Sequence, residues 1–190
     1  MNSVRFEEVY DQHYSDVWRY LLHISADTET ALDLTAQTFF RACRAWPQFK
    51  HEAPPKAWLL RIAVNEWRRE LRRRKIQRVV PFPKHWWRED GQIECDAGEI
   101  EAVNHEIERN ESYLTLQHAL RRLPEKYRTP LVLKYFEYLS LEEIAAILGR
   151  PVGTVKSLVH RGLAKLREDQ GLREAFSDFF IEAPQVTVEN

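Results

Sequence analysis

Apolar side chains recur every three or four residues along residues 140–168, and a single glycine interrupts this recurrence. The first stretch begins with Ser140-Leu-Glu-Glu143, the pattern of a capping box, and ends at Leu148. Gly149 supplies a turn, and a second helical stretch follows from about Pro151 to Asp169. Its inward positions are expected to be Val152, Val155, Val159, Leu163 and Leu166. Two such stripes pack at a steep angle across a three-residue turn, so the spacing predicts a helix-turn-helix unit.

The outward face of the second helix is polar or basic, apart from Leu158. Such side chains donate hydrogen bonds to phosphates and base edges, and base contacts concentrate in the first turns of a recognition helix. We interpret this face as a DNA-binding surface, although a generic three-helix domain with a basic outer face accounts for the same pattern. The candidate DNA-binding residues are Thr154, Lys156, Ser157, Leu158, His160, Arg161 and Lys165.

The rest of the chain also shows helical spacing, and strand signals are nearly absent. Helices are predicted over roughly residues 4–23, from an N-cap at Asp27 to just before Pro47, and from about Ala57 into an arginine-rich segment. Prolines and glycines punctuate the stretch that follows, and periodicity resumes near Leu114. We therefore expect an all-α fold with two small helical domains joined by an acidic linker. The predicted borders are 1–77, 78–111 for the linker, 112–172, and 173–190 for a C-terminal tail.

A formal net charge of −1 conceals strong segregation of charge along the chain. Residues 61–75 carry seven basic side chains against two acidic ones, a net of +5. Residues 88–111 carry nine acidic side chains against two basic ones, a net of −7. Residues 149–167 carry five Lys or Arg and no acid. This order indicates two anion-binding surfaces around a self-solvating connector, while solvated helix faces are the alternative.

Several classes of protein are excluded by what the sequence lacks. The two cysteines, Cys43 and Cys95, form no framework and no CxxC pair, so a reduced cytoplasmic setting is expected. The longest apolar runs are too short to span a bilayer, and the acidic N-terminus has no signal-peptide core. No HExxH, Walker A or GxSxG motif occurs. We expect no enzymatic activity, no metal, no cofactor and no small-molecule substrate.

Three segments resemble a known family. PPKAWLLRIAVNEWRRELRRRK at 54–75 resembles region 2 of bacterial RNA polymerase sigma factors of the sigma-70 family, in the compact extracytoplasmic-function (ECF) group. LPEKYRTPLVLKYFEYLSLEEIAAILGRPVGTVKSLVHRGLAKLRE at 123–168 resembles their region 4. ALDLTAQTFFRACRAWPQF at 31–49 resembles the part of region 2 that docks on core RNA polymerase. The resemblance implies a factor that binds core polymerase and directs promoter-specific initiation.

The resemblance also assigns roles to the two basic surfaces. The helix after Gly149 would recognise the −35 element. The loop from Phe49 to Lys56, with Asn65, would capture a flipped base of the −10 element while arginines track the backbone. Holding a separated strand does require a basic track and faces for unstacked bases. For Asn65, a solvated helix position is the alternative. The implied −10 set is Phe49, Lys50, His51, Lys56, Asn65, Arg68, Arg69, Arg72 and Arg73.

By the same resemblance, the helix after Asp27 would bind the clamp helices of the polymerase's largest subunit, and region 4 the flap of the second-largest. The implied core-binding residues are Asp33, Leu34, Gln37, Phe40 and Arg41. Family members carry a more acidic, DLVQE-like string where this chain has DLTAQ. Of Phe39 and Phe40, one is expected in the core and the other exposed, because neighbouring helix positions point about 100° apart.

Promoter DNA and an anti-sigma factor, often membrane-bound in this family, are the other implied partners. The protein would then be cytoplasmic, and could be held at the membrane by that factor. A stand-alone helix-turn-helix regulator is the alternative, but it would not need the stripe from Asn65 to Lys75. Leu158 departs from the arginine found in many relatives. It can contact a thymine methyl or rest against the protein, so recognition would rely more on its polar neighbours.

Overall fold

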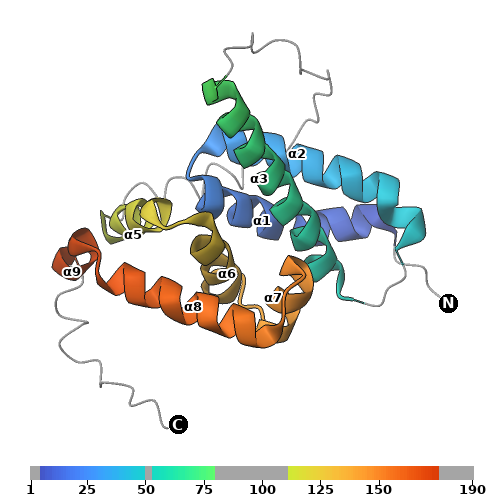
Figure 1. Cartoon of the computed structure of the whole chain (residues 1–190). Coiled ribbons are helices and arrows are strands. Elements are labelled where there is room, and N and C mark those ends of the chain that lie inside the picture. The colour runs from blue at the N-terminus through green and yellow to red at the C-terminus, as the bar shows by residue number, and fades with distance from the viewer. Residues whose placement is uncertain (1–4, 50–52, 80–110, 176–190) are drawn as a thin grey trace.

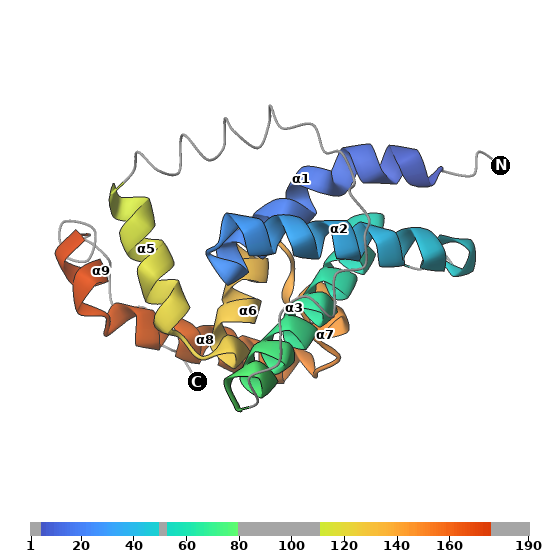
Figure 2. The same cartoon turned by 90° about the horizontal axis from the view of Figure 1, so that it is seen from above.

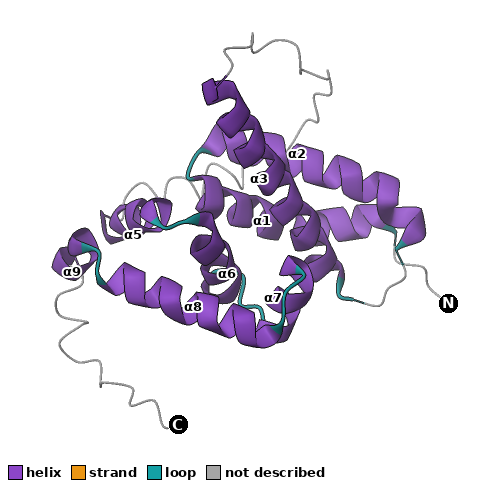
Figure 3. Cartoon of the chain, viewed as in Figure 1, coloured by secondary structure: helices purple, strands orange, loops and turns teal. Residues whose placement is uncertain are grey.

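The structure is a computed structural model that describes residues 5–49, 53–79 and 111–175, and every regular element within these ranges is helical (Figures 1 and 3). The N-terminal half, residues 5–79, contains α1 (Phe6–Ser25), α2 (Thr28–Ala45), the short 3-10 helix η1 (Trp46–Gln48) and α3 (Pro55–Val79). The C-terminal half, residues 111–175, contains α5 (Glu111–Arg122), α6 (Glu125–Tyr135), α7 (Leu141–Leu148), α8 (Val152–Arg167) and α9 (Gln170–Ala175). The predicted all-α fold is confirmed.

The predicted linker, 78–111, and tail, 173–190, lie mostly outside the described residues. Where they meet the described ranges, α3 continues to Val79, α5 begins at Glu111, and α9 runs from Gln170 to Ala175. The domain borders stay predictions.

Local hydrogen bonds begin and end the helices where the sequence predicts them. The Asp27 carboxylate accepts from the Thr30 amide at 3.0 Å, capping α2. At α7, the Glu143 amide donates to Ser140 Oγ at 3.1 Å, and the Ser140 amide donates to the Glu143 carboxylate at 2.8 Å. Gly149 has φ of 63°, a left-handed conformation that glycine adopts without a steric cost. These contacts fix the short turn between α7 and α8.

In the N-terminal half, α1, α2 and α3 pack their apolar faces together. Phe39 is buried on the inner face of α2, whereas its neighbour Phe40 is 54% exposed, as expected from their spacing. Trp18 lies in the core, whereas Trp58 is half-buried and packs against the edge of this core. This bundle holds α2 and α3 side by side with one long face of each exposed.

In the C-terminal half, α8 crosses closely over α6. A Cβ added at Gly162 would lie 2.8 Å from Leu131 Cδ1 and 3.3 Å from Tyr127 Cβ, so a larger residue would require the Leu131 side chain to shift. Val155 and Val159 are buried at the same contact. Val152 does not join them, because it begins the helix and is 38% exposed; the prediction that it faces inward was wrong.

The two halves pack directly against each other, which the sequence did not predict. The helix α6 lies against α1 and α7 lies against α3, as two views show (Figures 1 and 2). The rings of His23 and Phe136 have centroids 4.2 Å apart across this contact. His23 Nδ1 also lies 2.8 Å from both Tyr113 Oη and Gln117 Nε2 of α5. The buried residues of both halves therefore form one continuous hydrophobic core.

Candidate nucleic-acid interface

The outward face of α8 is exposed where the sequence placed DNA contacts. Its inward face packs on α6, α7 and α9. Ser157 Oγ donates to the Gly153 carbonyl at 3.0 Å, which leaves the hydroxyl oxygen able to accept. Thr154 and Leu158 are half-buried, so Leu158 rests partly against the protein. The exposed members of the predicted set are Lys156, Ser157, His160, Arg161 and Lys165.

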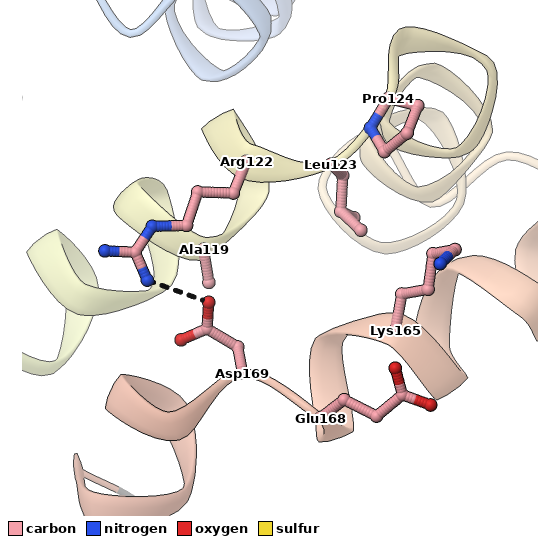
Figure 4. A pocket seen from close by; sticks show the side chains of 7 residues that line it. All are labelled: Ala119, Arg122, Leu123, Pro124, Lys165, Glu168 and Asp169. Atoms are coloured by element: carbon pink, nitrogen blue, oxygen red, sulfur yellow. Dashed lines mark hydrogen bonds and ion pairs between the residues drawn. The ribbon is translucent and has the colours of Figure 1, made fainter.

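The C-terminal end of α8 is tied to α5 beside a small hollow of about 230 Å³ (Figure 4). Arg122 donates to the Asp169 carboxylate at 3.1 Å, joining α5 to the residues just after α8. Lys165 and Glu168 line the same hollow. Two cations and two carboxylates balance there, so the hollow is no anion site. The hydrogen bond between Arg122 and Asp169 instead fixes the C-terminal end of α8.

On α3, a buried carboxylate organises two of the predicted contacts. Glu66 is 2% exposed, and its Oε1 accepts from Arg69 Nη1 at 2.6 Å and lies 2.9 Å from Arg41 Nε of α2. Hydrogen bonds that a guanidinium donates to a fixed carboxylate hold the guanidinium in one orientation. Glu66 therefore positions one arginine of the predicted −10 set and one of the predicted polymerase-binding set.

A second carboxylate, Glu70, does the same one turn later. Arg73 Nε donates to Glu70 Oε2 at 2.7 Å, and Arg74 donates to Oε1 and to Thr30 Oγ1 of α2. Burial raises the pKa of Glu70, but the hydrogen bonds from Arg73 and Arg74 outweigh it and hold the pKa below its usual value. The only two acids among residues 61–75 are thus buried beneath the arginines, and the exposed surface is more basic than the count of charges indicates.

The remaining −10 candidates on α3 differ in what surrounds them. Asn65 and Arg72 are exposed, and neither forms a hydrogen bond or ion pair with any described residue. Arg68 is half-buried, and its Nε lies 3.7 Å from the Glu125 carboxylate of α6. Arg68 is therefore engaged by the C-terminal half.

Phe49, at the end of η1, belongs to an aromatic cluster. The ring of Phe49 stacks on Trp46, with centroids 5.1 Å apart and planes at 22°, and contacts Trp58 at 4.7 Å. Lys50 and His51 lie outside the described residues. Of the loop candidates, Phe49 is thus positioned by stacking at the point where the chain leaves η1.

Lys56, at the start of α3, lies between two carboxylates. Its Nζ is 3.2 Å from Asp16 Oδ1 of α1 and 3.1 Å from Glu137 Oε2, just after α6. The Glu137 side chain is fully buried, and burial raises its pKa although the Lys56 ammonium opposes this. The sequence assigned Lys56 to nucleic acid, but here the ammonium holds the two halves together.

The predicted polymerase-binding residues share one exposed face of α2, with one exception. Asp33, Gln37, Phe40 and Arg41 are exposed. Leu34 is 3% exposed and belongs to the core, so its side chain is not part of that surface, contrary to the prediction. The Arg44 guanidinium lies 5.8 Å from the centroid of the Phe40 ring, a cation–π contact. Phe40 is therefore a large apolar side chain displayed on a polar helix face.

Comparison with known proteins agrees with this arrangement. Residues 9–76 match the family model "Sigma-70 region 2", and residues 113–166 match "Sigma-70, region 4". The chain is 31% identical over 166 residues to the ECF RNA polymerase sigma factor SigW of Bacillus subtilis, covering 86% of this chain and 87% of SigW. It is 32% identical over 139 residues to the RNA polymerase sigma-H factor of Pseudomonas aeruginosa, covering 71% and 70%. The chain is an ECF sigma factor of the sigma-70 family.

Another relative of this sigma factor is longer. The ECF RNA polymerase sigma factor SigE of Mycolicibacterium smegmatis is 33% identical over 163 residues, and the match spans 86% of this chain but 60% of SigE. Members of the family direct RNA polymerase to promoters, and this sigma factor is accordingly an initiation factor and not an enzyme.

Two solved structures share the fold of this sigma factor. One is the sigma factor RpoE in complex with the anti-sigma factor NepR from Bartonella quintana, at 24% identity and a TM-score of 0.66, covering 86% of this chain and 94% of that one. The other is CnrH in complex with the cytosolic domain of CnrY, at 23% identity and a TM-score of 0.59, covering 86% and 85%. At these identities the likeness establishes the fold.

Sequence reasoning missed the acids that organise this sigma factor. Asp16, Glu66 and Glu137 hold the cations that it did single out. The available signal for Glu66 and Glu70 was their position: they are two acids, four residues apart, within an otherwise basic helix. Within residues 5–49, 53–79 and 111–175, no group of His, Cys, Asp or Glu could hold a metal ion. No described helix combines the length and apolar character needed to cross a membrane.

Proposed function

We propose that this sigma factor reads the −35 element with α8, and the observation that carries this is the exposed basic face of a helix rigidly held by α6 and α7. Lys156, His160 and Arg161 lie on that face, and Ser157 keeps a hydroxyl oxygen free to accept. Leu158 is half-buried and contributes only apolar contact, such as to a thymine methyl. The preferred −35 sequence should therefore depend on the polar neighbours of Leu158, with Thr154 and Lys165 at the ends of the contact.

The −10 element would be held by α3 and the loop before it. Asn65 and Arg72 are exposed, and Arg69 and Arg73 are oriented by buried carboxylates, an arrangement suited to phosphates beside a flipped base. Phe49 would form one wall of the base pocket, with Lys50 and His51 assigned from the sequence alone.

Lys56 and Arg68 contribute to this surface only after leaving Glu137 and Glu125. We infer that the described arrangement is that of the free factor, and that promoter binding separates its halves.

Core RNA polymerase would bind the exposed face of α2, through Asp33, Gln37, Phe40 and Arg41, against the clamp helices of its largest subunit. An exposed aromatic side chain is a common anchor of such interfaces. Leu34 would support this face from within the core. The C-terminal half would meet the flap of the second-largest subunit. An anti-sigma factor that covers these faces, cytoplasmic or held at the membrane, would keep the factor inactive, and a fold shared with RpoE in its NepR complex is compatible with this.

Run-off transcription with purified core polymerase and genomic promoter fragments tests the mechanism on α3. Asn65→Ala should leave closed-complex formation unchanged and reduce the permanganate reactivity of the −10 region. His118→Ala, an exposed residue of α5, is the control and should behave as wild type. Normal melting by Asn65→Ala would remove Asn65 from the mechanism. A protein that binds duplex DNA alone but programs no initiation would be a stand-alone regulator instead.

Binding of upstream-element DNA by the polymerase holoenzyme tests α8. Arg161→Ala should weaken binding by about 1–3 kcal/mol if the guanidinium reaches a base, and should relax specificity at one position. Arg5→Ala removes the same charge from the exposed start of α1 and serves as the control. Equal affinity of Arg161→Ala and wild type for every sequence tested would show that Arg161 makes no base contact.

A further inference from the structure

A basic cleft of about 470 Å³ lies where the end of α3 meets α5 and α6. Its lining combines residues of both halves of the chain and includes four cations but no carboxylate. The lining residues are Ser25, Trp67, Leu71, Arg74, Lys75, Arg121 and Arg128. Neither the −10 set nor the polymerase-binding set includes any of them, so the cleft is separate from the surfaces described above.

Arg128 is the unusual member of this cleft because it is buried without an ion-pair partner and lies against the Trp67 ring. It is 9% exposed, its buried Nε–H donates to no acceptor, and the guanidinium forms no ion pair among the described residues. Burial lowers the pKa of this guanidinium, an effect that Glu125 only partly opposes. A buried charge without a hydrogen-bonded counter-ion is costly, so an anionic ligand that supplied the counter-ion would offset this cost.

The neighbouring cations leave the cleft short of negative charge. Arg121 and Lys75 are exposed, and neither forms a hydrogen bond or ion pair with the described residues. Arg74 is the exception, because Glu70 and Thr30 already accept its hydrogen bonds. Three positive charges from α3, α5 and α6 therefore converge without a carboxylate in ion-pair contact, although Asp27 attracts Arg121 and Glu125 attracts Arg128 over a longer range.

The chemistry of the lining selects the phosphate moiety of a ligand. Guanidinium groups bind phosphate oxygens through paired, charge-assisted hydrogen bonds. The Trp67 ring offers no stacking face for a base, because it is 2% exposed and the guanidiniums of Arg128 and Arg74 already lie 5.7 and 5.8 Å from its centroid. Three cations that form no ion pair match an anion with several charges better than they match a single carboxylate.

We propose that this cleft binds a compact, multiply charged phosphate group, of the kind found in pyrophosphate and in nucleoside di- or triphosphates. Arg121 and Arg128 contact it from the C-terminal half, and Lys75 contacts it from α3. The bound anion joins the two halves and stabilises the compact arrangement. The thermal unfolding midpoint of the full chain then rises with ligand concentration, as mass action requires.

Calorimetric titration of the full chain with pyrophosphate, at constant ionic strength, tests this site. Arg121→Gln and Arg128→Gln should each weaken binding by about tenfold or more, since each removes a charge-assisted hydrogen bond. Arg122→Gln is the matched control: it is the next residue of α5 and loses the same charge, but its partner is Asp169. It should bind pyrophosphate as wild type does.

Pyrophosphate binding that is unchanged in both cleft variants, or equally weakened in Arg122→Gln, would overturn the proposal. Arg121 is exposed, so Arg121→Gln keeps the test valid if Arg128→Gln does not fold. Two further ligands distinguish the sources of phosphate. Saturable binding of ATP that a short DNA duplex does not displace supports a small-anion site. Binding of the duplex through Arg121 and Arg128, without measurable binding of pyrophosphate or ATP, would make the cleft a DNA-backbone contact and refute the proposal.

Discussion

The ion pair between Lys56 and Glu137 should be one of the strongest single contacts between the two halves. Glu137 has a fully buried side chain, Lys56 is 26% exposed, and Asp16 lies on the other side of the ammonium. Replacing Lys56 with Met keeps most of the apolar stem of the side chain and removes the ammonium group. The two carboxylates then face each other without a cation between them, and the Asp16 charge already raises the pKa of Glu137.

The loss of stability caused by Lys56→Met can be calculated in two ways. Removing one partner of a buried ion pair costs about 3–5 kcal/mol, and the partial exposure of Lys56 favours the lower end of that range. The alternative is protonation of Glu137, which costs at most about 3 kcal/mol at pH 7 from the ordinary pKa of 4.5, and less because burial already raises this pKa. We therefore expect Lys56→Met to lower the free energy of unfolding by about 3 kcal/mol at pH 7, and by less as the pH falls toward 4.5.

Urea unfolding followed by circular dichroism measures this in a double-mutant cycle of Lys56→Met and Glu137→Gln. The loss caused by Lys56→Met should fall below about 1 kcal/mol in the Glu137→Gln background, since the buried charge is then absent. Lys126→Met, on the exposed side of α6, is the control and should cost little. An equal loss in both backgrounds, or no loss in wild type, would refute the reasoning and return Lys56 to a purely nucleic-acid role.

Two other features, the buried His23 and the close approach of α6 to Gly162, lead to predictions about stability. His23 is buried, and burial, with a smaller contribution from Arg19, lowers its pKa from 6.5 to about 4, so unfolding takes up a proton between these values. The free energy of unfolding should therefore fall as the pH drops from 6.5 to 4, by at most about 3 kcal/mol from this group, and His23→Gln should flatten that dependence in urea titrations; an identical slope would contradict it. Gly162→Ala should destabilise by about 1 kcal/mol, because crowding against Leu131 outweighs the gain in helix propensity. Gly153→Ala, in the same helix with open space around it, should stabilise slightly, and the same sign for both variants would show that packing at α6 is not the cause.

The helices and their caps could be predicted because the signals are local. The Ser140–Glu143 box, the Asp27 cap and the Gly149 turn each depend on residues within a few positions. The opposite burial of Phe39 and Phe40 follows from helix geometry in the same way. Such features need no knowledge of what the helix packs against.

Partner choice could not be predicted, because it depends on contacts far apart in the sequence. Tyr113 meets His23 across 90 positions, and nothing near either residue marks the pairing. Lys56 was correctly chosen as a cation, but its sequence neighbours do not reveal that Glu137 is its partner. The burial of Leu34 depends on distant contacts in the same way, because the resemblance names this position for polymerase binding but does not reveal that the bundle packs it in its core.

A single oxygen atom, Oε1 of Glu66, joins the helix proposed to meet the polymerase to the helix proposed to meet the promoter. Arg41 and Arg69 share it, so neither guanidinium can be reoriented without disturbing the other. A substitution at position 66 would thus register in two assays at once, as weaker association with polymerase and as altered melting of DNA, although its own side chain touches neither. Such a residue would be easy to misread as bifunctional when its single task is to keep two neighbouring surfaces in a fixed relation.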